Sequence, residues 1–122
     1  MNNFSLLKQF NKIEGLIVLA LVDALDGSIL ETIGDESFNF DFVATEDVNL
    51  FNYQKKLMDE ISPHDFLESV LMSTDHQYHI ITPLETNHCV FLYAILDRKQ
   101  TNLGYASHEI QKVERNLNFY TY

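Results

Sequence analysis

The stretch LIVLALVDAL at residues 16–25, with Asp26-Gly27 after it, decides the fold of this chain. Aliphatic residues fill both alternating sets of positions, which is typical of a strand covered on both faces. Asp26 and Gly27 tolerate the positive φ angles of a tight hairpin turn, so residues 28–33 are expected to return as an antiparallel second strand. The segment CVFLYAIL at 89–96 has the same two-sided apolar character and is also expected in the middle of the sheet.

Apolar spacing and capping residues predict one helix before this hairpin and another at the end of the sequence. Residues 2–12 carry apolar side chains at helical spacing, and Gly15 follows as a left-handed terminator. The last helix begins after a cap at Thr101 or Asn102. Its apolar residues recur every three or four positions: Leu103, Ala106, Ile110, Val113 and Leu117.

The longest expected helix covers residues 40–61 and begins near Asp41 or Thr45. This segment contains no Pro or Gly, and Ser62-Pro63 ends it because a residue before proline is pushed out of the helical region. Its apolar residues spread over well over half of the circumference, which is wider than the stripe that covers one face of a sheet. The members of this arc are Val43, Ala44, Val48, Leu50, Phe51, Leu57, Met58 and Ile61.

Two further strands are expected at residues 66–73 and 78–84, separated by the polar turn 73–77. The elements then follow the order α-β-β-α-β-β-β-α in a single domain of residues 1–122. We therefore predict an α/β fold in which helices sandwich a single five-stranded, mostly antiparallel sheet.

Composition limits the class of function. The 122 residues include 46% hydrophobic side chains, enough to bury one core, and the net charge of −10 would repel phosphate backbones and anionic lipid headgroups. No apolar stretch reaches the length of a membrane span, and residues 1–13 do not resemble a signal peptide. The single cysteine, Cys89, excludes an internal disulfide. We expect a cytoplasmic protein that binds no nucleic acid and does not insert into membranes.

The histidines and the cysteine form no catalytic or metal-binding pattern. His76 and His79 are three residues apart and would face opposite sides of a strand, so they converge on a metal only if one of them lies in the turn. His88 and Cys89 are adjacent and also point to opposite faces, and a cysteine in an aliphatic strand is usually a small buried hydrophobe. Neither pair predicts a site.

The acidic residues and the glycines give no enzymatic signature either. Asp23, Asp26 and Glu31 gather around the first hairpin without the ligand spacing of a calcium loop. The sequence has no GxxxxGK, serine-elbow or HExxH motif. We therefore expect a protein with no cofactor, no metal and no enzymatic activity. The acidic surplus serves either solubility or a basic partner, and its patches of interest are Asp35-Glu36, Glu46-Asp47 and Asp59-Glu60.

Short motifs in this element order carry a family resemblance. Ile13-Glu14-Gly15-Leu16 leads into the first strand, Asp23–Gly27 forms the first hairpin, and Thr101-Asn102-Leu103-Gly104 opens the last helix. Over nearly its whole length the chain resembles the roadblock/dynein light chain (Roadblock/LC7) domain family, whose fold is roadblock/profilin-like. Its fold-marking residues are Asp26, Gly27, Asn102, Leu103 and Gly104. We expect Asn102 to cap the helix, Leu103 to anchor it on the sheet, and Gly104 to let backbones approach closely.

The resemblance also implies a function. Family members are non-enzymatic platforms that pair as homodimers or paralogue heterodimers through the long helix and a neighbouring edge strand. Many of them regulate or scaffold small Ras-like GTPases or serve in motor complexes. For this chain, the resemblance implies a dimer or partner interface on the apolar arc at Ala44, Val48, Phe51 and Met58. The residues after Gly104 depart from the usual pattern, which leaves the partner open.

An alternative is a PAS-like module that senses a small molecule. Phe38, Phe40 and Phe42 would then line a cavity between a helix and the sheet. An ordinary helix-to-sheet core is the favoured interpretation of the same residues.

Overall fold

The computed structural model describes residues 8–34, 40–85 and 89–117, without the side chains of residues 40–45 and 47. Within these ranges, five strands form one sheet in the order β2-β1-β5-β4-β3, and every neighbouring pair is antiparallel. The strands are β1 (Leu16–Asp23), β2 (Ile29–Gly34), β3 (Val70–Ser73), β4 (Gln77–Pro83) and β5 (Val90–Asp97). The helices are the 3₁₀ helix η1 (Lys8–Lys12), α2 (Phe40–Ile61) and α3 (Leu103–Glu114). The predicted single antiparallel sheet between helices is confirmed.

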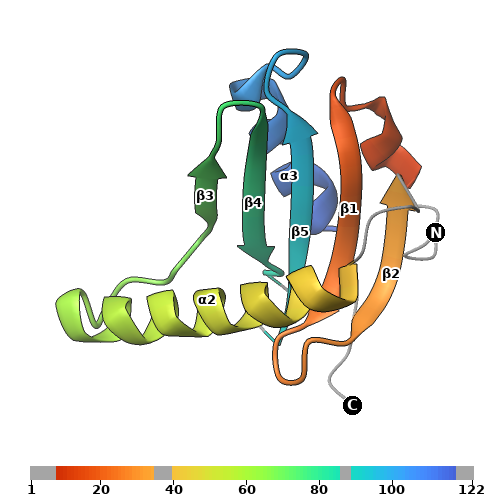
Figure 1. Ribbon diagram of the computed structural model, residues 1–122. Coiled ribbons are helices and arrows are strands. Elements are labelled where there is room, and N and C mark those ends of the chain that lie inside the picture. Colours follow the sequence, from red (N-terminus) through yellow and green to blue (C-terminus); the bar gives the residue numbers. More distant parts are fainter. Residues whose placement is uncertain (1–7, 35–39, 86–88, 118–122) are drawn as a thin grey trace.

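Two hydrophobic cores lie on opposite faces of the sheet. β1 and β5 are its middle strands and pair side by side, with Leu19 opposite Ala94. Every residue of β5 from Val90 to Leu96 is buried, as the two-sided apolar pattern predicts. On one face, Leu19 and Leu92 pack with residues of η1 and α3, and on the other face Phe91 packs with α2. Figure 1 shows α3 behind the sheet and α2 across its lower end.

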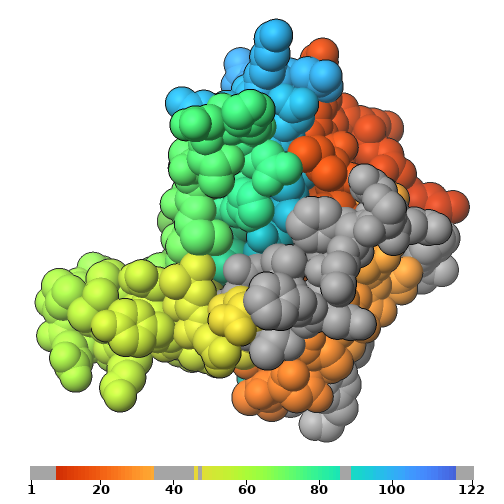
Figure 2. Space-filling model, viewed as in Figure 1, coloured from red at the N-terminus to blue at the C-terminus, as the bar shows by residue number. Residues whose placement is uncertain are grey.

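Only part of α2 covers the sheet. Val48 and Phe51 are buried in the core on that side, whereas Tyr53, Leu57 and Ile61 near the other end of the helix are exposed. In Figure 1 the helix continues past the edge strand β3, and in Figure 2 this half stands out as a ridge from the side of the molecule. Across the described residues, no helix combines the length and the apolar character needed to cross a membrane.

The first helix differs from its prediction. Residues 2–7 of the expected helix lie outside the described ranges, and residues 8–12 form a 3₁₀ helix. The Ile13 N–H donates to the Phe10 carbonyl at 3.0 Å, which is the tighter three-residue turn. Phe10 and Ile13 still reach the core against α3. The left-handed Gly15 is confirmed at a φ of 87°.

The first hairpin is wider than the predicted tight turn. β1 ends at Asp23 because the Asp23 carboxylate accepts the Leu25 N–H at 2.7 Å, which removes that N–H from the ladder. Asp26 accepts the Ser28 N–H at 2.8 Å, and Gly27 has a φ of 78°. The loop is closed by the Asp23 N–H, which donates to the Ser28 carbonyl at 2.9 Å. Asp26 and Gly27 therefore do shape the turn, as the last two residues of a longer loop.

The expected strand at residues 66–73 is shorter in the structure. β3 begins at Val70, which lies opposite Ile81 on β4. Continuing this register would bring Glu68 opposite Pro83, which has no N–H to donate. The bounds of β2, β4 and β5 are each shifted by one residue from their predicted positions.

Candidate protein-interaction surface

Exposed apolar side chains gather around the projecting half of α2 and the edge strand β3. Tyr53 and Ile61 on α2 are both 66% exposed, and Leu57 between them is 36% exposed. Phe66, in the segment after the helix, is 83% exposed, and Leu71 on β3 is 48% exposed. We call these five residues the α2–β3 surface. Figure 1 places both elements on the same side of the molecule.

The three α2 residues form one stripe because they are four residues apart. At about 100° per residue, Tyr53 lies roughly 200° around the helix from Phe51. Phe51 faces the sheet, where its ring packs 5.5 Å from the ring of Phe91. Tyr53 therefore points away from the chain's own core, and Leu57 and Ile61, at roughly 240° and 280°, continue the stripe toward the flank of the helix.

β3 provides an open backbone edge beside this helix. It pairs only with β4, and no strand of the described chain lies on its other side. It is only four residues long, and Leu71 at its centre remains exposed. An edge strand presents unpaired N–H and C=O groups to which a strand of another molecule can bond.

The structure places the predicted interface residues in different surroundings. Val48 is 7% exposed and Phe51 is 3% exposed, and both belong to the core between α2 and the sheet. Met58 is half-buried, and the side chain of Ala44 lies outside the described part of the chain. Their contact with a partner stays a prediction. The residues that sequence reasoning did not select are Tyr53, Phe66 and Leu71, and the four-residue spacing from Tyr53 to Ile61 is the signal that points to the stripe.

The motif at the start of α3 is partly confirmed. Asn102 caps the helix, since its side-chain oxygen accepts the Tyr105 N–H at 3.0 Å, and Leu103 packs against the core. The expected close approach at Gly104 is wrong within this chain, because an added Cβ would meet only the Asn102 side-chain oxygen, at 3.6 Å. Close approaches lie instead at Gly15, where a Cβ would overlap the Thr101 hydroxyl oxygen, and at Gly34, where it would overlap the Ile17 carbonyl oxygen.

The histidine pair does not converge. His76 is exposed in the turn, whereas the half-buried His79 on β4 has Nδ1 2.5 Å from the Tyr93 hydroxyl and Nε2 2.9 Å from Gln77 Oε1. Burial lowers the pKa of His79 below its ordinary value. In the described ranges, no group of three or more His, Cys, Asp or Glu residues is placed to hold a metal ion. His88, beside the half-buried Cys89, lies outside those ranges.

The acidic residues of the first hairpin serve the turn. Asp23 is 7% exposed and binds the Leu25 N–H, while Asp26 binds Ser28 and Glu31 lies further along β2. Hydrogen bonds from the side chain and then the backbone of Ser28 hold the pKa of Asp26 below its usual range. Each of the two aspartates thus binds a backbone N–H within the loop. Of the phenylalanines invoked for a sensor cavity, Phe38 and the side chains of Phe40 and Phe42 are outside the described part.

Comparison with known proteins gives structural matches only. No protein-family model and no curated protein matches the sequence. A Roadblock/LC7 domain from Streptomyces avermitilis superposes with a TM-score of 0.79 at 10% identity, covering 93% of this chain and 92% of that one. MglB from Myxococcus xanthus has a TM-score of 0.74 at 20% identity, covering 90% and 83%. The gliding protein MglB from Thermus thermophilus has a TM-score of 0.78 at 13% identity, covering 94% and 84%. With these likenesses and the sheet order described above, the chain has the Roadblock/LC7 fold.

Proposed function

We propose that this chain is a non-enzymatic, dimeric protein-interaction module of the cytoplasm that regulates or scaffolds a small Ras-like GTPase or a related signalling or motor complex. The observation that carries the proposal is the α2–β3 surface: an apolar stripe on a projecting helix beside an open strand edge. Self-association is supported by a similar structure, MglB with a tetrameric arrangement, which has a TM-score of 0.78 at 13% identity.

The energetics favour coverage of this surface by protein. The side chains of Tyr53, Leu57 and Ile61 are exposed to solvent on the half of α2 that extends beyond the sheet. Complete burial of a large apolar side chain contributes about 1.5–3 kcal/mol. A second copy that packs its α2 against this stripe and its β3 edge against this one would remove both the apolar stripe and the unpaired backbone groups from water.

The dimer is tested by the mass in solution. Light scattering at micromolar concentration is expected to give twice the chain mass for the native protein, and the chain mass for Leu57→Asp and Ile61→Asp, because a charge in an apolar contact loses its hydration without gaining a partner. Lys56→Gln is the matched control, because it also makes the net charge more negative by one unit. Lys56 is an exposed residue outside the stripe. A native protein that is a strict monomer would contradict the proposal.

The GTPase partner is tested by capture from the native cell lysate. The tagged protein is incubated once with GDP and once with a non-hydrolysable GTP analogue, and bound proteins are identified by mass spectrometry. We expect a Ras-like GTPase in one nucleotide state and its loss with Leu57→Asp or Ile61→Asp. Recovery of no GTPase in either nucleotide state would contradict the proposed GTPase partner but not the proposed dimer.

A further inference from the structure

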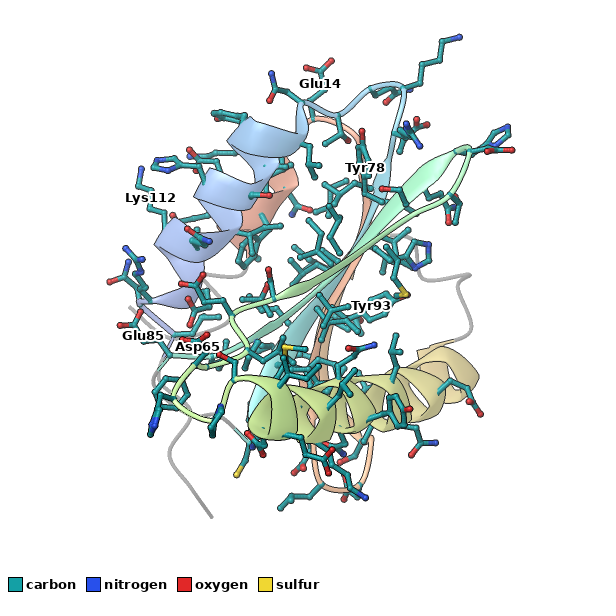
Figure 3. All side chains as sticks on the ribbon, turned by 90° about the vertical axis from the view of Figure 1, so that its left-hand side faces the viewer. Glu14, Asp65, Tyr78, Glu85, Tyr93 and Lys112 are labelled. Atoms are coloured by element: carbon teal, nitrogen blue, oxygen red, sulfur yellow. The ribbon has the colours of Figure 1, made fainter. Side chains whose placement is uncertain are left out.

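A groove of about 420 Å³ is lined by residues of α2 that lie outside the stripe. Its walls are the inner side of the C-terminal half of α2, the segment 63–68, the end of β4 and the last turn of α3. Figure 3 looks onto this part of the molecule, with Asp65 and Glu85 labelled between the end of α3 and the C-terminal part of α2. Phe66 is the one residue that belongs to both the groove and the α2–β3 surface.

The groove has apolar walls. Phe51 is buried, and Met58, Leu67 and Pro83 are half-buried along it. Phe66 extends this apolar lining to the outside, where it is 83% exposed. An aliphatic side chain or the stem of a long side chain would find contacts here.

The groove is also strongly acidic. Its lining includes the carboxylates of Asp59, Asp65, Glu68, Glu85 and Glu114 but only two cationic side chains, Lys55 and Arg115. Arg115 is already paired with Glu85, at 3.2 Å. Asp65 accepts a hydrogen bond from the Ser62 hydroxyl, and Glu114 accepts the Glu85 N–H.

The side chains of two carboxylates at this site form neither an ion pair nor a hydrogen bond with a described residue. Asp59 on α2 and Glu68 in the segment before β3 are both exposed, and neither forms an ion pair with a described residue. Lining of this kind attracts a positively charged group and repels an anion.

We propose that this groove docks an arginine-bearing apolar segment of another protein. The guanidinium group offers several N–H donors in one plane, which suits carboxylates that approach from different walls, and it sheds water more readily than an ammonium group. Its aliphatic stem would lie along Met58 and Leu67, and the apolar neighbours in the segment would cover Phe66. A second copy of this chain is a poor occupant because it carries a net charge of −10.

This site shares Phe66 with the α2–β3 surface, but its carboxylates belong to the groove alone. The stripe residues Tyr53, Leu57 and Ile61 do not line the groove. Substitution of the groove carboxylates is therefore not expected to dissociate the dimer.

The probe for the experiment is the tripeptide Leu-Arg-Leu, acetylated and amidated at its ends, and its control is the same peptide with citrulline, which keeps the shape of arginine without the charge. Binding is followed by the backbone amide resonances of the ¹⁵N-labelled protein. We expect saturable shifts at Met58, Leu67, Glu68 and Glu85, with binding of the citrulline peptide at least tenfold weaker.

Charge variants separate a local site from general attraction to an acidic protein. Asp59→Asn with Glu68→Gln removes two charges from the groove and is expected to weaken Leu-Arg-Leu binding at least tenfold. Glu14→Gln with Asp75→Asn removes two exposed charges elsewhere and is expected to change it less than twofold. Equal binding of the two peptides, equal effects of the two double variants, or shifts outside the groove would overturn the proposal. Light scattering of the same samples reports the oligomeric state, so a failed groove and a failed dimer give different results.

Discussion

Gly15 and Gly104 differ in the space and the backbone conformation that they offer to a side chain. Gly15 has a φ of 87°, and a Cβ there would overlap the Thr101 hydroxyl oxygen, which donates to the Glu14 carbonyl at 3.1 Å. Gly104 lies in the first turn of α3, where a Cβ would make only an ordinary contact with the Asn102 side-chain oxygen. The same substitution to alanine should therefore change stability in opposite directions.

We predict that Gly15→Ala lowers the free energy of unfolding by more than about 1–2 kcal/mol, since the left-handed backbone alone costs that much for an L-residue. Gly104→Ala should raise it by up to about 1 kcal/mol, because alanine is the better helix former. Urea unfolding followed by circular dichroism measures both. A destabilised Gly104→Ala variant would contradict the second prediction and indicate a close contact that the chain itself does not make.

His79 links stability to pH. The Gln77 side-chain oxygen accepts only, so Nε2 carries the proton and Nδ1 accepts from the Tyr93 hydroxyl. Burial lowers the pKa of His79 in the folded state, so the unfolded chain binds the proton first as the pH falls. Stability should be at its full value above the unfolded pKa of about 6.5 and decrease below it.

Urea unfolding between pH 5 and pH 8 tests this dependence. His79→Gln should flatten the curve in that window, whereas His76→Gln, an exposed position in the turn, should keep the native slope. Parallel curves for the native protein and His79→Gln would assign the pH dependence to other groups.

At the scale of single residues, features that depend on neighbouring residues can be predicted from the sequence. Features that depend on tertiary contacts cannot. The cap at Asn102 and the left-handed conformations of Gly15 and Gly27 depend on neighbours within a few positions, and sequence reasoning finds them. The space around Gly104 depends on elements far away in the chain, and its expected role was wrong.

At the scale of the element, α2 shows what periodicity leaves open. Its end at Ile61 follows from Ser62-Pro63 and is predicted correctly. Its wide apolar arc, however, does not reveal which part faces the sheet. The structure divides the arc into a buried side with Val48 and Phe51 and an exposed stripe that includes Leu57. The interface predicted from the sequence stays a prediction, and the exposed side of α2 could be identified only from the packing.

The two sides of α2 should respond differently to truncation. We predict that Phe51→Ala lowers the free energy of unfolding by about 3–5 kcal/mol, because it removes a buried ring packed on Phe91. Leu57→Ala should change the stability of the monomer by less than about 0.5 kcal/mol. Unfolding is measured at a concentration low enough to dissociate a dimer, since association adds to the apparent stability. Similar losses for both variants would mean that Leu57 also packs within its own chain.

At the scale of the whole molecule, the order of strands in the sheet is the part that a single sequence does not fix. β1 and β5 are recognisable as central strands because both are apolar on both faces. Their pairing joins residues far apart in the sequence, such as Leu21 with Leu92. No local signal encodes such a contact, and the structure is needed to show that the hairpin of β1 and β2 lies beside β5.

The net charge of the whole chain sets the salt dependence of self-association. Two copies that each carry a charge of −10 repel one another at low ionic strength, whereas the apolar contact at the α2–β3 surface is insensitive to moderate salt. Raising the ionic strength from about 0.01 M to about 0.1 M shortens the screening length from about 30 Å to about 10 Å. We therefore predict that the dissociation constant of the dimer falls over this range.

Sedimentation equilibrium at several salt concentrations measures the effect, with Leu57→Asp as the control that should remain monomeric throughout. Dissociation on addition of salt would show that opposite charges hold the two copies together, which the exposed apolar stripe does not predict. Binding of the Leu-Arg-Leu peptide to the groove should respond in the opposite direction, because salt screens an attraction there and a repulsion between the copies. Opposite salt dependences of self-association and of peptide binding would show that this acidic chain uses the stripe on α2 for apolar contact and the carboxylates of the groove for electrostatic attraction.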